Sequence, residues 1–490
     1  MPSERTFLLA DLTAFAQLSG DFNPLHTDPV AARRTQFGEC VTHGVLVLMW
    51  ALDCWQEQSG STRRWKKISA KFLRPVPTGV RVTATITAKS AEEISIAVGE
   101  SGRVLLQCDV IWAEAGSAMN NSSARDEIPP REAPVRDCHQ TAMANRETLE
   151  LFWPEKLGRQ LFPSLAKTQL PDSMSALLAT TRLIGMKVPG EHSVFLQLDL
   201  AFELHPEIAQ PFTYRVTVFR KSLQRLGLAI AGSACQGMLW ALVRPAPVAQ
   251  PDMAAVRQQI PSDRFRGRRV IIIGGSRGLG EIAAKVLTAG GAEVALSYRL
   301  GGDDAKRVVA DITAHGGQAF AFQFDTARMD WEENLAAHCL RFNHLCYFPT
   351  PPIVGGDGST FNSELFAKFC DVYVAGLVNV AQWLAKQNAG QFALFNASTV
   401  YVESPPLRNL EYAAAKAASE ACGRWLAGAY PKARVYAARF PRLNTDQTAS
   451  FLSEREHDNL EIMLLELSAW LSGGAGITAG EGHLPWPPDR

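Results

Sequence analysis

The order of apolar and polar positions predicts a buried helix followed by strands in the first part of the chain. Residues 45–52 are apolar at every position, so a helix formed there must be buried on all sides. In residues 80–86 and 94–98 the apolar residues recur at every second position, and a third strand is predicted for residues 103–112. A period of two indicates a sheet with one buried face. The pattern predicts a first domain over residues 1–115.

The same plan recurs in the middle of the chain. Residues 116–143 are rich in Ala, Ser, Asn and Pro without periodicity, which predicts a linker. An apolar helix that begins near Pro171 is followed by alternating strands in residues 194–202 and 214–218. We predict a second domain over residues 144–245 and another linker over residues 246–264. An unrelated α+β domain remains an alternative for this middle part.

A third pattern follows, in residues 265–490. The all-apolar strand at residues 270–273 runs into a glycine-rich loop, a helix over residues 281–289 and a strand over residues 293–297. In this order the glycines can hold a dinucleotide phosphate at the helix N-terminus. The residues expected around that phosphate are Gly274, Ser276, Arg277, Gly278, Leu279 and Gly280.

The second strand of this domain ends in Tyr298-Arg299 rather than in an acidic residue. Arg277 and Arg299 are expected near the 2′ position of the adenosine, where a guanidinium can bind a phosphate. The sequence therefore predicts NADP(H) rather than NAD as the cofactor.

Composition narrows the classes of partner. The chain has 490 residues, and its 49 Lys and Arg balance 49 Asp and Glu, so no basic field favours nucleic acid or an anionic membrane. The 9 cysteines include no C-x-x-C pair, which argues against a disulfide framework or a zinc site, and no metal is expected. No signal peptide or spanning segment is predicted, so we expect a cytoplasmic protein.

Candidate acid/base chemistry lies near the N-terminus. Asp21 and His26 flank the Asn23-Pro24 turn, and proline restricts this short loop. Gly44 precedes the buried apolar helix, where its N–H can stabilise a developing oxyanion.

The motifs Ser-Gly-Asp-Phe-Asn-Pro-Leu-His at residues 19–26 and Val-Thr-His-Gly at residues 41–44 resemble the MaoC-type (R)-specific enoyl hydratase/dehydratase family. This resemblance implies a hot-dog fold, an antiparallel sheet round a central helix. It also implies that Asp21 and His26 share the proton transfers on an acyl thioester while Gly44 holds the thioester oxygen. The middle domain lacks these residues and is expected to be a second, non-catalytic hot-dog paired with the first.

Residues 396–399, Asn-Ala-Ser-Thr, and the pair Tyr412 and Lys416 resemble the short-chain dehydrogenase/reductase family. On a helix, residues four apart share a face, so the Lys416 ammonium can lower the pKa of the Tyr412 phenol. The resemblance implies that Tyr412 donates a proton, that Thr399 positions the carbonyl and that Asp325 contacts the adenine.

Three departures from this family stand out. Residues 344–352 replace its usual Asn-Asn-Ala-Gly, Phe440-Pro441 replaces its Pro-Gly, and Tyr373 stands where a helix Asn supports the proton relay. We expect the Tyr373 hydroxyl to take over part of that relay.

The fold expected is multidomain α+β and α/β, an N-terminal double hot-dog followed by a Rossmann doubly wound parallel sheet. The function expected is a bifunctional 3-ketoacyl-thioester reductase and 3-hydroxyacyl-thioester dehydratase, acting in fatty-acid-like or polyketide biosynthesis on substrates carried by acyl carrier protein or coenzyme A. The alternatives are a dehydratase with a degenerate NADP-binding scaffold and a non-catalytic acyl-carrier docking module. A homodimer is also considered.

Overall fold

The computed structural model describes residues 3–59, 63–100, 102–114, 124–136, 146–168, 170–202, 211–232, 235–326, 328, 330–353, 358, 360–450 and 457–472. Its contacts divide the chain into two compact units, with the main boundary between Ala246 and Pro247. The first contains an antiparallel sheet and the second a parallel one, which confirms the predicted fold class.

One ten-stranded sheet runs through the whole N-terminal unit, in the order β1-β3-β4-β5-β2-β7-β10-β9-β8-β6. The first five strands in the chain are β1 (Ser3–Thr6), β2 (Arg63–Phe72), β3 (Arg81–Ala88), β4 (Glu93–Glu100) and β5 (Arg103–Glu114). The other five are β6 (Glu147–Thr148), β7 (Ser193–Ala201), β8 (Thr213–Arg220), β9 (Arg225–Ala231) and β10 (Gln236–Val243). We call residues 3–114 the first half of this unit and residues 146–246 its second half.

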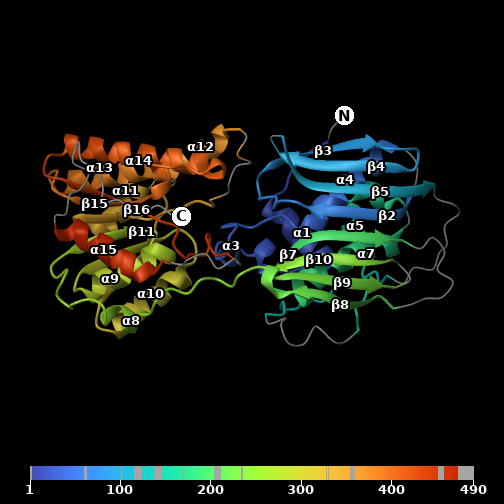
Figure 1. Cartoon of the computed structure of the whole chain (residues 1–490), viewed down its shortest axis with the longest axis horizontal. Helices are drawn as coiled ribbons and strands as arrows, with labels where there is room; N and C mark the ends of the chain where they lie inside the picture. The colour runs from blue at the N-terminus through green and yellow to red at the C-terminus, as the bar shows by residue number, and fades with distance from the viewer. Residues whose placement is uncertain are drawn as a thin grey trace. The chain divides into compact units, whose positions relative to one another are not determined.

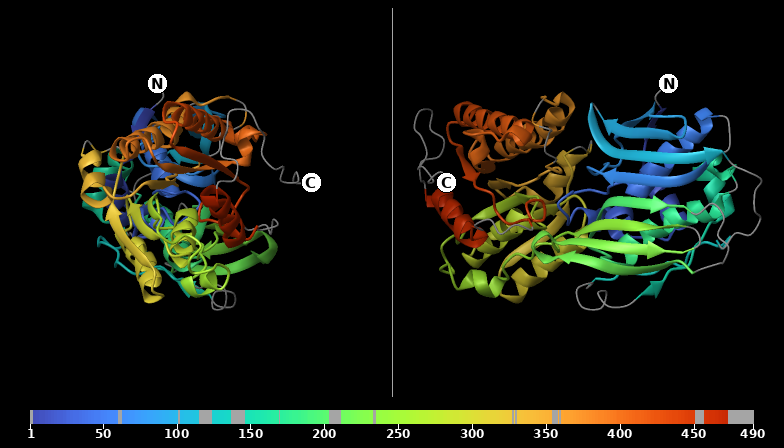
Figure 2. Two further views of the ribbon diagram at one scale, coloured as in Figure 1. Left: turned by 90° about the vertical axis from the view of Figure 1, so that its left-hand side faces the viewer. Right: turned by 45° about the vertical axis from the view of Figure 1, so that its right-hand side comes forward.

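The two halves repeat each other about the sheet centre. Strands β2 and β7 pair there in antiparallel register, with Ala70 opposite Leu198, and the strand order outward from them is equivalent on the two sides. Figures 1 and 2 show blue strands continuing into green ones with α1, α4 and α7 on one side of the sheet. The second half thus has the helix-and-sheet plan predicted from its sequence. Residues 116–123 and 137–143 of the predicted linker lie outside the described residues.

The α-helices of this unit are α1 (Leu9–Ser19), α2 (Pro24–Thr27), α3 (Pro29–Ala32), α4 (Gly44–Ser59), α5 (Glu155–Leu161), α6 (Pro163–Ala166) and α7 (Pro171–Arg182). Helix α7 continues as a π-helical turn, η1 (Leu183–Lys187), and a separate 3-10 turn, η2 (Lys221–Leu223), follows β8. The apolar run of α4 is buried throughout, as its pattern predicts. Asp53 on α4 accepts the N–H groups of Ser164 and Leu165, so the helix of the first half caps α6 of the second.

The C-terminal unit holds six parallel strands in the order β13-β12-β11-β14-β15-β16. The strands are β11 (Arg269–Ile273), β12 (Glu293–Tyr298), β13 (Gln318–Gln323), β14 (His344–Tyr347), β15 (Ala393–Thr399) and β16 (Arg434–Phe440). The helices are α8 (Met253–Arg257), α9 (Gly278–Ala289), α10 (Gly302–Ala314), α11 (Trp331–Cys339), α12 (Ser363–Cys370), α13 (Leu377–Gln387), α14 (Leu410–Ala429) and α15 (Asn459–Ser472), with the π-helical turn η3 (Asp371–Gly376) and the 3-10 turns η4 (Val400–Val402) and η5 (Leu407–Asn409).

Helices cover both faces of this sheet, so β11 is apolar at consecutive positions. Val270 and Ile272 pack into one core, while Ile271 and Ile273 pack into the core on the opposite face. The strand order is that of a doubly wound dinucleotide-binding fold, in which ligands bind beyond the carboxyl ends of the central strands.

The segment 246–264, predicted as a linker, packs against the parallel-sheet core instead. It contains α8, whose Met253 and Val256 are fully buried. The ammonium of buried Lys285 donates to the Pro251 carbonyl at 2.8 Å and pairs with Glu281 at 3.0 Å. Met253 and Val256 are three positions apart on α8, so both side chains lie on the same face of the helix and pack into the core. The proline-rich composition of this segment explains the linker prediction.

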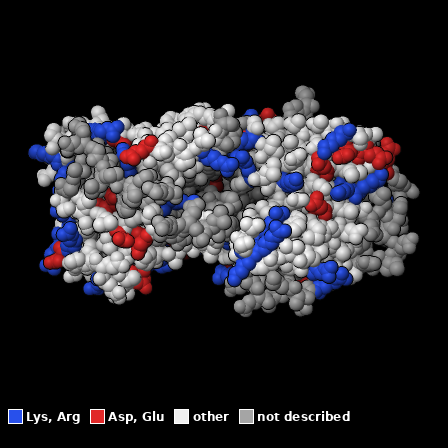
Figure 3. All heavy atoms as spheres, viewed as in Figure 1, with Lys and Arg blue, Asp and Glu red and all other residues white. Residues whose placement is uncertain are grey.

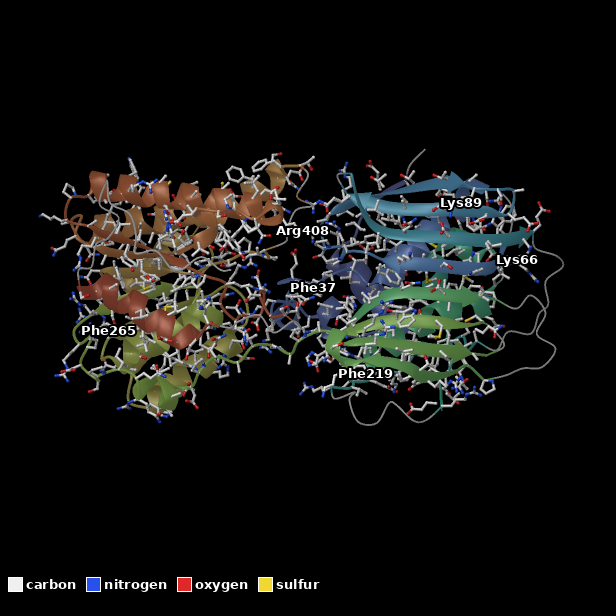
Figure 4. The ribbon with its side chains drawn as sticks, viewed as in Figure 1. Phe37, Lys66, Lys89, Phe219, Phe265 and Arg408 are labelled. Carbon is white, nitrogen blue, oxygen red and sulfur yellow. The ribbon has the colours of Figure 1, made fainter. Side chains whose placement is uncertain are left out.

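Charged side chains of both signs are interspersed over the face of each unit drawn in Figure 3. Lys66 and Lys89, labelled in Figure 4, lie on the strand side of the N-terminal unit and pair with Glu92 and Asp109. Such exposed pairs contribute little to stability, because both ions remain hydrated and screened by solvent. Within the described part of the chain, no helix combines the length and apolarity that crossing a bilayer requires.

Candidate active sites

The loop after α1 presents an acid and an imidazole from a stiff scaffold. The Asn23 side chain caps α2 by accepting the Leu25 N–H at 3.0 Å, and Pro24 occupies the first turn of that helix. His26 lies two residues further along α2, and the Asp21 carboxylate precedes it with only 1% of the residue exposed. The predicted bend therefore places His26 on a capped helical turn and Asp21 just before that turn.

The hydrogen bond of His26 selects one tautomer of its neutral ring. Nδ1 lies 2.7 Å from the Val41 carbonyl oxygen, so this nitrogen carries the proton and donates. Nε2 is then the basic atom of the ring, and His26 lines the cavity described below. Burial lowers the pKa of His26, against the opposing charge of Asp21 and the hydrogen bond to Val41.

Burial has the opposite effect on the acid. It raises the pKa of Asp21, while the charge of His26 and the hydrogen bonds from Thr181 and Asn23 act to lower it. The environment thus favours a neutral carboxyl group beside a neutral imidazole.

A second imidazole, that of His43, contacts both residues of the pair. The ring of His43 stacks on His26 with centroids 3.9 Å apart, and its Nε2 donates to the Asp21 backbone carbonyl at 3.0 Å. Burial holds the pKa of His43 well below its usual value, so its ring is neutral. Asp21, His26 and His43 place potential ligand atoms within 4.8 Å of one another, a spacing also seen at metal sites. In each imidazole one ring nitrogen donates to a backbone carbonyl, so the other nitrogen can act as a base or as a ligand atom.

Asp21 and His26 face a cavity of about 160 Å³ between the two halves of the N-terminal unit. Its lining is mostly apolar, with Phe72 from β2 and Phe195 from β7 in tilted ring contact at 4.9 Å. Phe37, labelled in Figure 4, also lines it. Gly44 begins α4 at the cavity wall, and a Cβ there would lie 2.7 Å from the Phe72 ring. The first-turn N–H groups of α4 lack helical acceptors and are available to an oxyanion.

The second half contributes residues to this site that the sequence did not identify. The Thr181 hydroxyl at the end of α7 donates to Asp21 Oδ2 at 2.6 Å. A Cβ on Gly185 would come within 2.2 Å of Asp21 Oδ1, so the carboxylate lies directly against that backbone. Asn23 Nδ2 also donates to the Gly185 carbonyl at 2.9 Å. No local sequence pattern marks these residues, because their importance depends on contact with a loop about 160 positions away.

In the C-terminal unit, the glycine loop joins β11 to the N-terminus of α9. A Cβ on Gly280 would lie 2.2 Å from the Gly274 carbonyl oxygen, so the loop can close this tightly only with glycine. Gly278 begins α9 with φ +58°, and a Cβ there would have only a Thr445 methyl within 4 Å. Ser276 is buried and Leu279 packs against the core. The open N-terminus of α9 provides N–H groups suited to a phosphate.

The two arginines predicted near the adenosine differ in their surroundings. The Arg277 guanidinium donates twice to the Asp446 carboxylate, at 2.7 and 2.8 Å, and lies 3.6 Å from Asp304. Arg299, immediately after β12, has an exposed side chain. Asp325 lies two residues beyond β13 and is partly buried. Arg277 thus forms ion pairs with two described carboxylates, whereas the Arg299 side chain is exposed.

Thr399 ends β15, and Tyr412 and Lys416 lie one turn apart on α14. A hydrogen bond with the Thr399 hydroxyl lowers the pKa of Tyr412, but burial outweighs it and raises that pKa to about 12. Lys416 Nζ donates to the Ala397 carbonyl at 2.6 Å, and burial lowers its pKa to about 7. Lys416 is not among the groups that shift the pKa of the Tyr412 phenol, and its Nζ lies 6.0 Å from the centroid of that ring.

Tyr373 contacts Lys416 through the face of its ring, whereas the sequence suggests a role for its hydroxyl. Lys416 Nζ lies 3.8 Å from the centroid of the Tyr373 ring, a cation–π contact with its face. The Tyr373 and Tyr412 rings meet edge to face at 5.7 Å. The ring, rather than the hydroxyl, is therefore what Tyr373 offers to the lysine.

Comparison with known proteins connects both sites to families. Residues 2–104 match the MaoC like domain, and residues 268–455 match the short chain dehydrogenase family. The (R)-specific enoyl-CoA hydratase of Aeromonas caviae is 36% identical over 90 residues, which are 18% of this chain and 67% of that protein. The chain belongs to the MaoC-like family, fused to a short-chain dehydrogenase domain.

Other relatives match the short-chain dehydrogenase domain. The 1-cyclohexenylcarbonyl-CoA reductase of Streptomyces collinus is 34% identical over 98 residues, 19% of this chain and 34% of that protein. A solved short-chain dehydrogenase/reductase from Serratia marcescens has 22% identity and a TM-score of 0.39, covering 42% of this chain and 91% of its own. The chain thus spans two thirds of the hydratase but only about a third of the reductase.

Both families agree with the resemblances inferred from the motifs at residues 19–26, 41–44 and 396–416. In the MaoC-like domain the structure brings Asp21, His26 and Gly44 to one cavity. In the short-chain dehydrogenase domain it brings Tyr412 to Thr399, and Lys416 to Tyr373. The chain therefore carries two separate constellations suited to proton transfer, one in each unit.

Proposed function

We propose that the protein reduces a 3-ketoacyl thioester in its short-chain dehydrogenase domain and dehydrates the 3-hydroxyacyl thioester in its MaoC-like domain. The observation that carries the proposal is the Asp21–His26 pair at an apolar cavity, on a chain that also holds Tyr412 beside Lys416. The product of the reduction is the substrate of the dehydration, so the fusion joins consecutive steps. NADPH as reductant makes the biosynthetic direction the expected one.

In the dehydration, His26 Nε2 removes the proton from the α-carbon and Asp21 protonates the leaving β-hydroxyl. The α C–H bond and the β C–O bond break, a C=C bond forms, and water leaves. Burial favours the protonated form of Asp21 and the neutral form of His26, which are the forms that this direction requires. We propose that the N–H of Gly44, at the start of α4 in the cavity wall, binds the thioester oxygen, where negative charge develops. Hydration is the reverse of these steps.

The substrate class follows from the lining of the cavity. Its apolar walls, including Phe72 and Phe195, suit an acyl chain, while the polar groups gather at the Asp21 end. The Aeromonas caviae relative is named for an enoyl-CoA substrate. We propose that the substrate is a thioester of coenzyme A or acyl carrier protein. We also propose that the protein is cytoplasmic, acts without nucleic acid or membrane, and associates as a homodimer.

The residues of the dehydrogenase domain fit NADP(H). The glycine loop is open above Gly278, the N-terminus of α9 offers N–H groups to the diphosphate, and exposed Arg299 follows β12. When bound, NADPH supplies the hydride that reduces the 3-keto carbon. Asp325, just beyond β13, is proposed to contact the adenine.

The chain's own residues complete the reduction. Tyr412 protonates the carbonyl oxygen, and the Thr399 hydroxyl holds that oxygen in place. Lys416, with a pKa of about 7, supplies a proton source within the same buried cluster. The ring face of Tyr373 holds the ammonium there.

Two alternatives make different predictions for one assay. The purified protein is incubated with a 3-ketoacyl thioester and NADPH, and both NADPH absorbance and the 2-enoyl product are followed. We expect both signals. A dehydratase with a degenerate cofactor-binding scaffold would interconvert 3-hydroxyacyl and 2-enoyl thioesters without oxidising NADPH. A docking module would bind the thioester without turnover, and either outcome would overturn the bifunctional proposal.

A further inference from the structure

The hydrogen bond between Thr181 and Asp21 joins the second half of the N-terminal unit to the acid/base pair. Its donor is the Thr181 hydroxyl and its acceptor is Asp21 Oδ2, 2.6 Å away. Both residues are buried, with 4% and 1% exposed. Because the hydroxyl is shielded from water, this bond is the carboxylate's main substitute for solvation on that oxygen.

The neighbouring threonine of α7 shows that this contact is not the usual behaviour of a helical hydroxyl. Thr180 Oγ1 donates to the Leu177 carbonyl one turn earlier, at 2.7 Å. Thr181 instead directs its hydroxyl out of its helix to a different element. The two adjacent threonines therefore offer a test residue and a matched control.

Other contacts hold the carboxylate against the end of α7. Asp21 Oδ1 accepts the Asn23 N–H at 3.2 Å, and Gly185 leaves no room for a side chain beside it. The imidazole of His26 interacts electrostatically with the Asp21 carboxylate, and its positive charge lowers the pKa of that group. His43 binds the backbone carbonyl of Asp21 rather than its side chain. Among these groups, Thr181 is the side-chain hydroxyl that contacts Oδ2.

We propose that Thr181 is a positioning residue of the dehydratase site, so that the second half of the unit, expected to be catalytically silent, directs the acid of the first half. This inference rests on the proposed dehydratase function. The hydroxyl fixes the orientation of the Asp21 carboxylate, which lines the cavity. It also stabilises the charged form of Asp21, in which the group must remain after giving up its proton.

The experiment compares Thr181→Val and Thr181→Ser with Thr180→Val in the full-length protein. Valine keeps the shape of the side chain and removes the hydroxyl. We expect Thr181→Val to lower kcat for hydration of a 2-enoyl thioester about tenfold or more, with little change in KM, since hydrogen bonds to charged groups contribute about 1.5–3 kcal/mol. The pH limb governed by Asp21 should move to higher pH. Thr181→Ser should restore the rate and the limb, and Thr180→Val should leave the pH profile unchanged.

A measurement without turnover separates this inference from the proposed function. The His26 titration is followed by NMR after selective labelling of histidine, with the signal assigned by a His26→Gln variant. Because the charge of Asp21 raises the pKa of His26, loss of the Thr181 hydroxyl should lower the His26 midpoint, and Thr180→Val should not. Thr181→Ala removes the same hydroxyl without adding a methyl group, so it replaces Thr181→Val if valine disturbs the fold. It should lower the His26 midpoint in the same way.

Each outcome decides one of the two ideas. A wild-type rate, pH profile and His26 midpoint in Thr181→Val would overturn the positioning role. A wild-type protein without hydratase activity would instead overturn the proposed function, and the His26 titration would then decide by itself whether Thr181 controls the charge on Asp21.

Discussion

Burial changes the protonation of the two groups in the MaoC-like site in opposite directions. Asp21 is buried beside Gly185 and its pKa is raised, whereas the pKa of His26 is lowered. A carboxyl group and an imidazole that are both neutral form a matched acid and base, and charge develops only as the reaction proceeds. The fold is stabilised less than it would be by an apolar pair, since each group must lose its water.

Removal of either group should abolish the lyase chemistry alone. We expect Asp21→Asn and His26→Ala each to lower hydration of a 2-enoyl thioester about 10²–10⁴-fold, the usual contribution of a general acid or base. NADPH binding, measured by fluorescence titration of the same preparations, should stay unchanged because the cofactor residues lie in the other unit. Near-normal hydration in both variants would place the active site elsewhere.

The raised pKa of Asp21 also predicts how stability changes with pH. The folded state binds this proton more tightly than the unfolded chain, so the group's favourable contribution is complete below the usual pKa of 3.8 and is lost as pH rises through the folded pKa. Asp21→Asn carries no charge and should unfold at a higher temperature than the wild type at about pH 7, with no difference near pH 4. Thermal unfolding at the two pH values provides the measurement, and equal midpoints at pH 7 would contradict the shift.

The two arginines of the glycine-loop region should separate in a cofactor-binding assay. Arg299→Ala is expected to weaken NADPH about 10–100-fold and NADH little, since a guanidinium gains most from a phosphate. Arg277→Ala should weaken both cofactors, because it removes the ion pair that ties the glycine loop to Asp446. Equal losses of NADPH and NADH in Arg299→Ala would remove it from the 2′-phosphate site.

At the level of elements, the π-helical turn η3 between α12 and α13 determines how Tyr373 is presented to Lys416. An extra residue in one turn of a helix rotates the side chains that follow. Tyr373 lies on this turn, stacks on Phe369 with rings 16° from parallel, and presents its face to Lys416. The cluster therefore places aromatic rings next to the ammonium group of Lys416.

This arrangement changes the effect expected for substitutions of Tyr373. Tyr373→Phe keeps the ring and should keep most of the NADPH oxidation, whereas the sequence alone predicted a partial loss. Tyr373→Leu should lower kcat several-fold or more, as a desolvated cation–π contact contributes up to about 2 kcal/mol. It should also move the limb governed by Lys416 below pH 7, because the ring stabilises the charged amine. A lower rate in Tyr373→Phe than in Tyr373→Leu would return the role to the hydroxyl.

For the whole molecule, the functional division falls between the ten-stranded sheet and the parallel sheet, not between the two hot-dog halves. Strands β2 and β7 pair over residues 67–71 and 197–201, so separating the halves would expose a long hydrogen-bonding edge on each. The cavity would also lose Thr181 and Phe195. The two halves therefore act as one catalytic unit.

Truncation tests this division. Residues 1–246 produced alone should fold and hydrate 2-enoyl thioesters at a rate close to that of the full chain, since every described residue lining the cavity is present. Residues 1–115 should be insoluble or inactive, because β2 loses its partner strand. Hydratase activity in residues 1–115 would show that the second half is dispensable.

Local patterns in the sequence determined the helix at residues 44–59, the glycine loop before α9 and the motif pairs Asp21/His26 and Tyr412/Lys416. Residues a few positions apart on a turn or helix keep their relation in any fold that forms that element. Only the tertiary structure decided that Thr181 and Gly185 enclose Asp21, that Arg277 binds Asp446, that the ring of Tyr373 faces Lys416 and that residues 246–264 pack on the parallel-sheet core. These contacts join distant segments or depend on the rotation of one helical turn, and they form only once strand pairing and helix packing fix where each segment lies.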